Sequence, residues 1–235
     1  EKLFENSDAL TAALTDSIND DLSLQLSTSG TASIAVSGGN TPKPLYQQLS
    51  KIEIDWSNIT VTLTDDRWVT FDHPASNERM VKHHLLKNEA ATAKFISLKT
   101  PDSTAKDGEP LLDKTLKEHL PTLDFVVLGM GDDGHFASLF PHTEELAEGL
   151  SLSSSKRCLA TRAPVDPAER ISLTLSMLLT AKKIYLFITG DDKLKVYRRA
   201  CSTDQAENTA SLPITAVLTQ TEVPVEVFWA PTSKG

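Results

Sequence analysis

The sequence is poor in cysteine, in long apolar runs and in serine-nucleophile motifs, and each shortage excludes a class of protein. Its two cysteines, Cys158 and Cys201, lie far apart without metal-type spacing, so we expect free thiols in a reducing compartment. No run reaches the roughly 18 apolar residues of a membrane span, and the first residues show no signal-peptide pattern. We therefore expect a cytoplasmic protein with no membrane partner. No serine stands in a Gly-x-Ser-x-Gly elbow, which leaves little support for a serine hydrolase.

Positive charge is also scarce. The 23 Lys and Arg residues against 32 Asp and Glu residues give a net charge of −9. Proteins that follow phosphate backbones usually carry a basic face, so nucleic acid is not an expected partner. An anionic small molecule would instead need a local cluster of Lys and Arg. A composition of 40% hydrophobic and 23% charged residues is typical of a globular protein, and we expect one domain over residues 1–235.

Helical and strand patterns alternate along the chain. Apolar residues recur every three or four positions from Asp8 to Leu26, which predicts an amphipathic first helix. Short apolar runs predict strands at 33–37, 59–63, 95–98, 123–128, 158–162, 184–188 and 225–229. Further helices are predicted after Pro42 and over 76–87, 107–120, 174–181 and 191–201, with surface loops at 149–157 and 202–212. This alternation predicts an α/β fold, a doubly wound, mostly parallel sheet with helices on both faces.

The first loop of interest follows the predicted strand 33–37. In open parallel sheets, ligands bind at the carboxyl ends of the strands, where loops and helix N-termini converge. This loop combines Gly38, Gly39, Asn40 and Thr41, so backbone N–H groups can approach an anion at a helix start. An ordinary tight turn is the alternative, because the stretch matches neither the dinucleotide fingerprint nor the P-loop.

Three cations are candidates for binding such an anion. Arg67 follows two acids at a strand end, where it can bind a phosphate through two hydrogen bonds or form a structural ion pair. Lys193 lies in the first turn of a predicted helix, a place that the helix dipole makes unfavourable for a cation, so a ligand role gains weight. Arg170 precedes an apolar segment and is either a third ligand or a solvated charge.

A histidine lies in the glycine-rich loop that follows 123–128. Asp133 precedes His135 by two residues, close enough for the turn to orient the imidazole or to fix its tautomer. A histidine at this place is a candidate for proton transfer near neutral pH, although an isolated histidine is more often structural. The adjacent His83 and His84 diverge on a helix and cannot form an i, i+4 metal pair, so no metal site is predicted.

Taken together, these motifs resemble those of the 6-phosphogluconolactonases, in the same order and over nearly the whole chain. The segments that carry the resemblance are Gly38–Pro42, Asp65–Val69, Asp72–Asn77, Gly129–Pro141, Arg170–Ser172 and Thr189–Lys193. The resemblance implies a fold related to glucosamine-6-phosphate deaminase and ribose-5-phosphate isomerase. It also implies hydrolysis of 6-phospho-D-glucono-1,5-lactone to 6-phosphogluconate in the oxidative pentose phosphate pathway, with no metal and no other cofactor.

The resemblance also suggests roles for the candidate residues. His135 would take a proton from water and return it to the departing ring oxygen, and Asp133 would orient it. The substrate phosphate would be held by Arg67, Lys193, the 38–41 turn and Arg170. Asp66 is placed with this binding group. Three residues depart from the family pattern: Asn40 stands where Ser is frequent, Asp66 where Glu is usual, and His142 where a small residue often follows Phe-Pro.

Two other functions stay open beside the lactonase hypothesis. Deaminases on the same fold share Asp-Gly-His but usually continue with Phe-Asn-Glu-Pro, whereas this chain continues with Phe136-Ala137-Ser138-Leu139 and lacks that carboxylate. A non-catalytic sugar-phosphate sensor is the third hypothesis, although no DNA-binding module or basic helix is present in the sequence. The sequence is compatible with a monomer and leaves the oligomeric state open.

Overall fold

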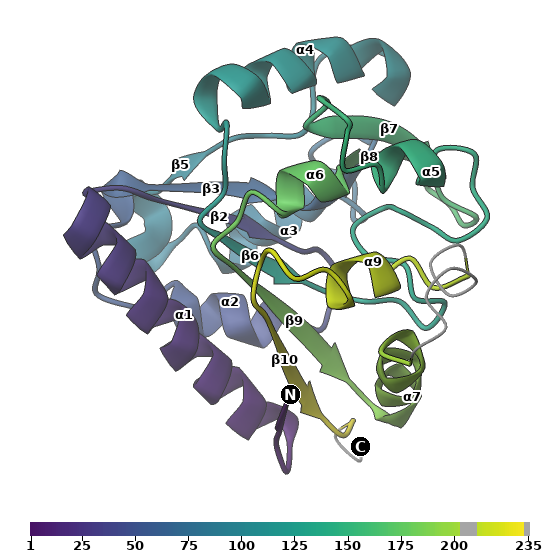
Figure 1. Ribbon diagram of the computed structural model, residues 1–235. Coiled ribbons are helices and arrows are strands. Elements are labelled where there is room, and N and C mark those ends of the chain that lie inside the picture. The colour runs from purple at the N-terminus through teal and green to yellow at the C-terminus, as the bar shows by residue number, and fades with distance from the viewer. Residues whose placement is uncertain (203–210, 233–235) are drawn as a thin grey trace.

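The structure, a computed structural model, describes residues 1–202 and 211–232 and is built around a seven-stranded sheet (Figure 1). Its strands are β1 (Lys2–Leu3), β2 (Ala32–Val36), β3 (Ile59–Leu63), β5 (Lys94–Phe95), β6 (Phe125–Leu128), β9 (Lys183–Thr189) and β10 (Val225–Ala230). Their order is β1-β10-β9-β6-β2-β3-β5, and every neighbouring pair is parallel. The predicted doubly wound parallel sheet is confirmed.

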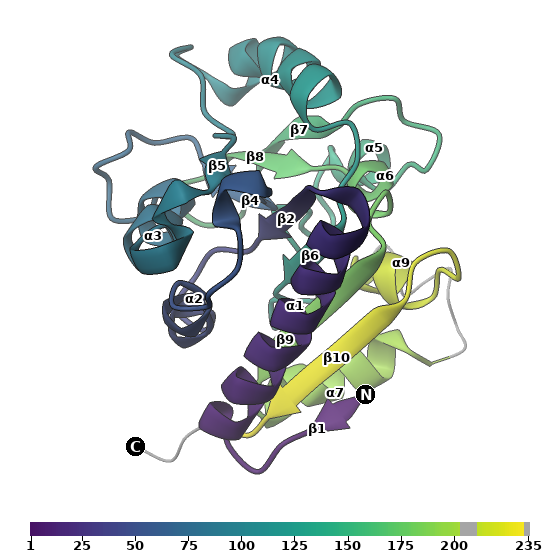
Figure 2. The same cartoon turned by 90° about the vertical axis from the view of Figure 1, so that its left-hand side faces the viewer.

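Helices lie on both faces of this sheet. They are α1 (Ser7–Ser29), α2 (Lys43–Leu49), α3 (Asn77–His84), α4 (Ala105–His119), α5 (Leu146–Gly149), α6 (Leu175–Leu178), α7 (Asp191–Ala200) and α9 (Thr215–Leu218), with 3₁₀ turns at Trp56–Asn58 and Asn88–Thr92. In Figure 2, α1 and α2 lie on one face, and α7 and α9 lie on the other. The helix predicted over 174–181 is a single turn, and most of the loop predicted over 202–212 lies outside the described residues.

Helix α1 shows how the sequence pattern becomes packing. The side chain of Asn6 caps its start by accepting the Ala9 N–H at 2.8 Å, and Gly30 ends it in the left-handed conformation, with φ 73°. The side chains of Leu10, Leu14, Ile18 and Leu22 are fully buried, and α1 packs against the sheet and α2. Burial of this stripe, rather than helix propensity, holds α1 in place.

A second, smaller sheet departs from the prediction. Its strands are β4 (Asp65–Arg67), β8 (Glu169–Leu173) and β7 (Cys158–Arg162), paired antiparallel in the order β4-β8-β7. The strand predicted at 158–162 therefore exists, but it does not belong to the main sheet. In the register of β4 with β8, Arg67 lies directly opposite Arg170. This pairing brings two of the predicted anion ligands together.

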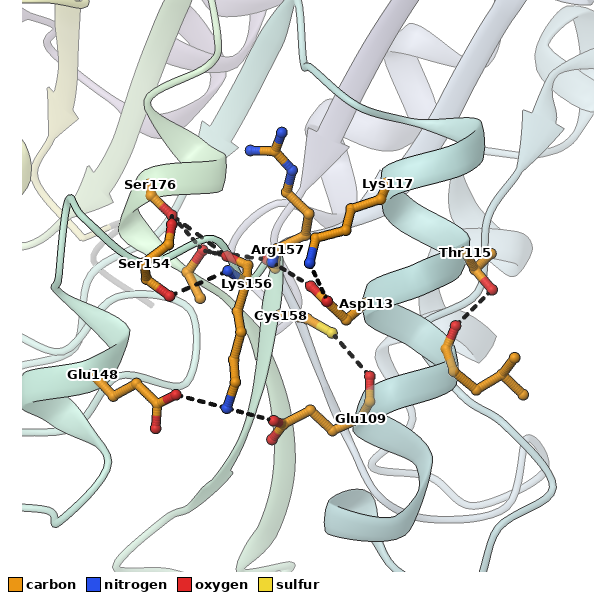
Figure 3. A network of polar contacts seen from close by, with 12 residues as sticks. Glu109, Asp113, Thr115, Lys117, Glu148, Ser154, Lys156, Arg157, Cys158 and Ser176 are labelled. Atoms are coloured by element: carbon orange, nitrogen blue, oxygen red, sulfur yellow. Dashed lines mark hydrogen bonds and ion pairs between the residues drawn. The ribbon is translucent and has the colours of Figure 1, made fainter.

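A polar network fastens this small sheet to α4 and α5 (Figure 3). The buried carboxylate of Glu109 accepts the Ala160 N–H at 2.8 Å and pairs with Lys156 Nζ at 2.8 Å. Lys156 also pairs with Glu148 at 2.6 Å, and the two carboxylates raise the pKa of its ammonium group. Through β7, this network supports the β8 strand that carries Arg170.

Candidate active site

A cleft of about 390 Å³ lies at the carboxyl ends of β2, β6 and β9, with β4 and β8 completing its wall. This is the place where ligands bind in open parallel sheets. The predicted residues that line it are Gly38, Gly39, Asn40, Thr41, Arg67, His135, Arg170 and Lys193. Asp66 and Asp133 do not line the cleft, but each accepts a hydrogen bond from a residue that does, Arg67 and His135 respectively. The structure therefore brings the candidate proton-transfer group and the candidate anion ligands into one cavity.

His135 is held by the aspartate two residues before it. Its Nδ1 lies 2.6 Å from Asp133 Oδ1, which also accepts the His135 backbone N–H at 3.1 Å. Partial burial acts to raise the pKa of Asp133, but the hydrogen bond and charge of His135 outweigh it, so that pKa lies below its ordinary value. An ionised carboxylate can only accept a hydrogen bond, so Nδ1 carries the proton. The lone pair of a neutral His135 is therefore on Nε2.

The loop around His135 depends on a close approach of backbone to side chain. The Gly131 N–H donates to the His135 carbonyl at 2.9 Å, and a Cβ atom at Gly131 would lie 2.1 Å from His135 Nδ1. Phe140 also packs against the imidazole, with ring centroids 4.3 Å apart. Together, these contacts fix the ring plane. They explain why this turn needs glycine at position 131.

The two arginines of the small sheet form a cationic wall. Arg67 donates from Nη1 to the Ala75 carbonyl at 2.7 Å, and Arg170 donates from Nε to the Pro167 carbonyl at 2.6 Å. Neither forms an ion pair with a carboxylate among residues 1–202 and 211–232, so the ion-pair alternative for Arg67 has no support. Burial, and then the charge of Arg67, lower the pKa of Arg170. Two adjacent guanidinium groups without a carboxylate partner favour a bound anion.

The turn after β2 offers unpaired donors. The backbone N–H groups of residues 39–41 have no hydrogen-bond partner in the described part of the chain. Gly39 has a φ of 95°, a conformation that favours glycine. A Cβ atom at Gly38 would lie 2.0 Å from Asn77 Oδ1, so this position needs glycine as well. Lys193 faces the same cleft from α7 and forms no ion pair with any described residue. Free N–H groups beside a free ammonium group suit a phosphate.

Of the two adjacent acids on β4, sequence reasoning selected Asp66, but Asp65 is the one that lines the cleft. Asp66 is buried, and its carboxylate accepts the N–H groups of Arg67, Asn77 and Glu78 at 2.7, 2.7 and 3.0 Å. It thus supports the start of α3 and the turn that carries Arg67. Burial raises the pKa of Asp66 to about 6 despite these hydrogen bonds.

Asp65, Asn77 and Ser138 belong to the site and were missed from the sequence. Ser138 is buried and donates its hydroxyl to Asp65 Oδ2 at 2.6 Å, which ties the His135 loop to β4. Asn77 lines the cleft and donates to the Asp65 carbonyl at 2.9 Å. The Asp-Asp-Arg and Ala-Ser-Leu stretches were visible signals, but the contact between them depends on tertiary packing.

Three further structural findings concern a metal site, His142 and membrane-spanning helices. Within the described ranges, no group of three or more His, Cys, Asp or Glu side chains is arranged to hold a metal ion. His142, the departure noted after Phe-Pro, is exposed and has a φ of 61°, and it does not line the cleft. Over the same part of the chain, every helix is too short or too polar to span a bilayer.

Comparisons with known proteins agree with this geometry. The family model described as glucosamine-6-phosphate isomerases/6-phosphogluconolactonase matches residues 5–229. A 6-phosphogluconolactonase of Rhizobium meliloti (strain 1021) is 39% identical over 230 residues, which cover 97% of each chain. The crystal structure of a 6-phosphogluconolactonase from Shewanella baltica OS155 matches with a TM-score of 0.92 and 43% identity, over 97% of this chain and 96% of that one.

A more distant structure shares the fold alone. A monomeric glucosamine-6-phosphate deaminase matches with a TM-score of 0.77 at 17% identity, over 98% of this chain and 96% of that one. The family resemblance found in the sequence motifs is confirmed. With its cleft, its motifs and its relatives in agreement, the chain belongs to the glucosamine-6-phosphate isomerase/6-phosphogluconolactonase family.

Proposed function

We propose that the protein is an enzyme that hydrolyses 6-phospho-D-glucono-1,5-lactone to 6-phosphogluconate, with His135 as its general base. This is the reaction of a 6-phosphogluconolactonase, the name of the Rhizobium meliloti relative that is 39% identical over 97% of this chain. The observation that carries the proposed mechanism is the His135–Asp133 pair, 2.6 Å apart, in a cleft lined by Arg67, Arg170 and Lys193.

His135 serves as base and then as acid in this mechanism. Its Nε2 lone pair takes a proton from water while the water oxygen bonds to the lactone carbonyl carbon. As the tetrahedral intermediate collapses, the bond between that carbon and the ring oxygen breaks, and Nε2 returns the proton to the ring oxygen. Asp133 stabilises the imidazolium formed between these steps. Positioned proton transfer of this kind contributes about 10²- to 10⁴-fold in rate.

The remaining cleft residues position the phosphorylated substrate. The N–H groups of residues 39–41 and the ammonium group of Lys193 bind the phosphate, and Arg67 and Arg170 complete the positive wall. Because the whole chain carries a charge of −9, this local cluster has to overcome long-range repulsion of the anion. The phosphate thus anchors the substrate, and the lactone carbonyl is presented to His135.

The deaminase alternative has a specific observation against it. At the position where deaminases carry the Glu of Phe-Asn-Glu-Pro, this chain has Ser138, whose buried hydroxyl donates to Asp65. A carboxylate that could shuttle protons beside His135 is therefore absent at that place in the loop. We place the reaction in the cytoplasm, consistent with the free thiols of Cys158 and Cys201.

The test compares decay of the phosphorylated lactone, generated in situ, with and without the protein. We expect clear acceleration over the spontaneous decay and no ammonia release from glucosamine 6-phosphate. Release of ammonia would favour the deaminase. Binding of the lactone without acceleration would favour the sensor and contradict the proposal.

A further inference from the structure

A second cavity, of about 340 Å³, opens beside the active-site cleft between α2 and α3. We call it the side pocket and define it by Lys43 of α2 and Arg79, His83 and His84 of α3. Arg67 lines both cavities, as do Gly39, Asn40 and Asn77, so the two cavities adjoin. None of the four defining residues lines the cleft that holds His135, so the side pocket adjoins that cleft but has cationic groups of its own.

The charge of the side pocket is positive and uncompensated. No carboxylate lines it, and the side chains of Lys43 and Arg79 form neither an ion pair nor a hydrogen bond within the described ranges. The acid of the same helix, Glu78, instead pairs with Lys82 at 2.7 Å. In a protein of net charge −9, a cavity whose permanently charged lining residues are all cations needs an explanation.

Lys43 and Arg79 both lie in the first turns of their helices, where a cation does not stabilise the helix. Lys43 is the first residue of α2, and Arg79 is the third residue of α3. The helix dipole disfavours a cation in the first turn. The first turn of α2 holds no acidic residue, and Glu78 in the first turn of α3 pairs with Lys82 rather than with Arg79. Helix stability therefore does not account for the presence of Lys43 and Arg79.

The histidines of the side pocket add N–H donors, and the lowered pKa of His84 is consistent with a positive potential there. The Gln47 side-chain amide donates to His84 Nδ1 at 3.1 Å, which leaves His84 Nε2 as a donor, and the two histidine rings meet edge to face at 5.3 Å. Burial lowers the pKa of His84, and the charges of His83, Lys43 and Lys87 lower it further. A bound anion would relieve this crowding of like charges.

We propose that the side pocket binds the phosphate group of a small ligand, at a site that adjoins the active-site cleft and is coupled to it through Arg67. A tetrahedral dianion matches two permanent cations and the imidazole N–H groups. The side pocket is nearly as large as the cleft, so it has room for a small phosphorylated molecule as well as for the free ion.

Arg67 supplies the coupling between the two sites. Its Nη1 is held by the Ala75 carbonyl, and its buried Nε has no partner in the described structure. A ligand in the side pocket and a substrate in the cleft would compete for hydrogen bonds from the Arg67 guanidinium, and their negative charges would repel each other. Binding at one site therefore weakens binding at the other, and the weakening is reciprocal.

The experiment is isothermal titration calorimetry of the full chain with inorganic phosphate and, separately, with glycerol 3-phosphate. We expect two sites in the wild type. The double variant Lys43→Gln/Arg79→Gln should weaken one site by about tenfold or more and spare the other, because each lost contact is a charge-assisted hydrogen bond. Lys193→Gln should weaken the other site. Lys82→Gln removes the same charge from the outer face of α3 and should leave both sites unchanged.

The results discriminate clearly, because binding is measured without turnover and does not depend on the proposed reaction. A single site in the wild type would overturn the proposal, as would equal binding by Lys43→Gln/Arg79→Gln and Lys82→Gln. Tighter binding of glycerol 3-phosphate than of inorganic phosphate at the side pocket would identify a phosphate monoester as its ligand. The opposite order would identify the free ion. Thermal unfolding of each variant controls for folding.

Discussion

At the level of single residues, the orientation of His135 depends on the absence of a side chain at Gly131. A Cβ atom there would lie 2.1 Å from His135 Nδ1, whereas one at Gly129 would meet nothing closer than Ser37 Oγ at 3.8 Å. We predict that Gly131→Ala lowers the rate of lactone hydrolysis by about 10²-fold or more, because a misplaced base loses its geometry. Gly129→Ala, in the same turn, should keep nearly normal activity. Equal activity of the two variants would contradict this account of the loop.

Asp66 gives a prediction about pH. Its pKa is raised by burial to about 6, above the value of 3.8 that it has when exposed, so the folded state holds its proton more tightly than the unfolded state does. Its contribution to stability is therefore fully present below pH 4 and is lost as pH rises through 6. The loss is about 3 kcal/mol if the whole shift is expressed.

Urea unfolding of the wild type and of Asp66→Asn across pH 4 to 7 measures this effect. The quantity compared is the slope of the free energy of unfolding against pH. The two proteins should differ in this slope, because the side-chain amide in the variant does not titrate and the carboxyl group of Asp66 does. The free energy of unfolding of the wild type should fall relative to that of the variant as pH rises. Parallel curves would show that the three N–H donors at the start of α3 keep the pKa of Asp66 near its ordinary value.

Among the secondary-structure elements, the buried carboxylate of Glu109 helps to attach α4 to the small sheet. Glu109 accepts the Ala160 N–H and pairs with Lys156. We predict that Glu109→Ala lowers the free energy of unfolding by about 2 to 4 kcal/mol, because it leaves a backbone donor unpaired and removes a buried charge from its partner. Lys114→Ala on the same helix removes an exposed pair with Glu118 and should cost about 0.5 kcal/mol or less. Similar losses in the two variants would contradict this role for Glu109.

The same elements show what sequence patterns can and cannot predict. The parallel strands were predictable, because they are short apolar runs between helical patterns. Strand β4 was not, since Asp65–Arg67 is a three-residue polar stretch whose pairing with β8 is set by tertiary contacts. Arg67 and Arg170 were each identified, but their direct opposition depends on that register. The choice of Asp66 over Asp65 as the residue lining the cleft was wrong. Adjacent residues of a strand face opposite sides, and the sequence does not show which side of β4 faces the cleft.

For the molecule as a whole, the cations of the cleft have to attract an anionic substrate that the net negative charge of the protein repels. We predict that the Michaelis constant for the lactone rises with added potassium chloride, since screening weakens attraction within the cleft. Potassium phosphate at equal ionic strength should raise it further, because phosphate competes for the same donors. Arg67→Ala should raise the Michaelis constant and reduce inhibition by phosphate, and Lys195→Gln, which removes an exposed charge paired with Asp192, should change neither. No difference between chloride and phosphate would contradict an anion site in the cleft.

The assembly of the site from separate loops follows from the whole fold. Because β2, β6 and β9 are parallel neighbours around one point of the sheet, the loops after them meet, and this much was predictable from the alternation of elements. The distances within the site were not predictable. They depend on close contacts such as Ser138 with Asp65, which no local pattern specifies.

The measurement that tests the central claim most directly is the first-order rate of lactone decay with His135→Ala, with His142→Ala as the matched control. His142 is an exposed histidine of the same loop region and lies outside the cleft. We predict that His135→Ala lowers turnover by about 10²- to 10⁴-fold with an unchanged unfolding temperature, and that His142→Ala retains nearly normal turnover. Near-normal turnover by folded His135→Ala would contradict the assignment of His135 as the base.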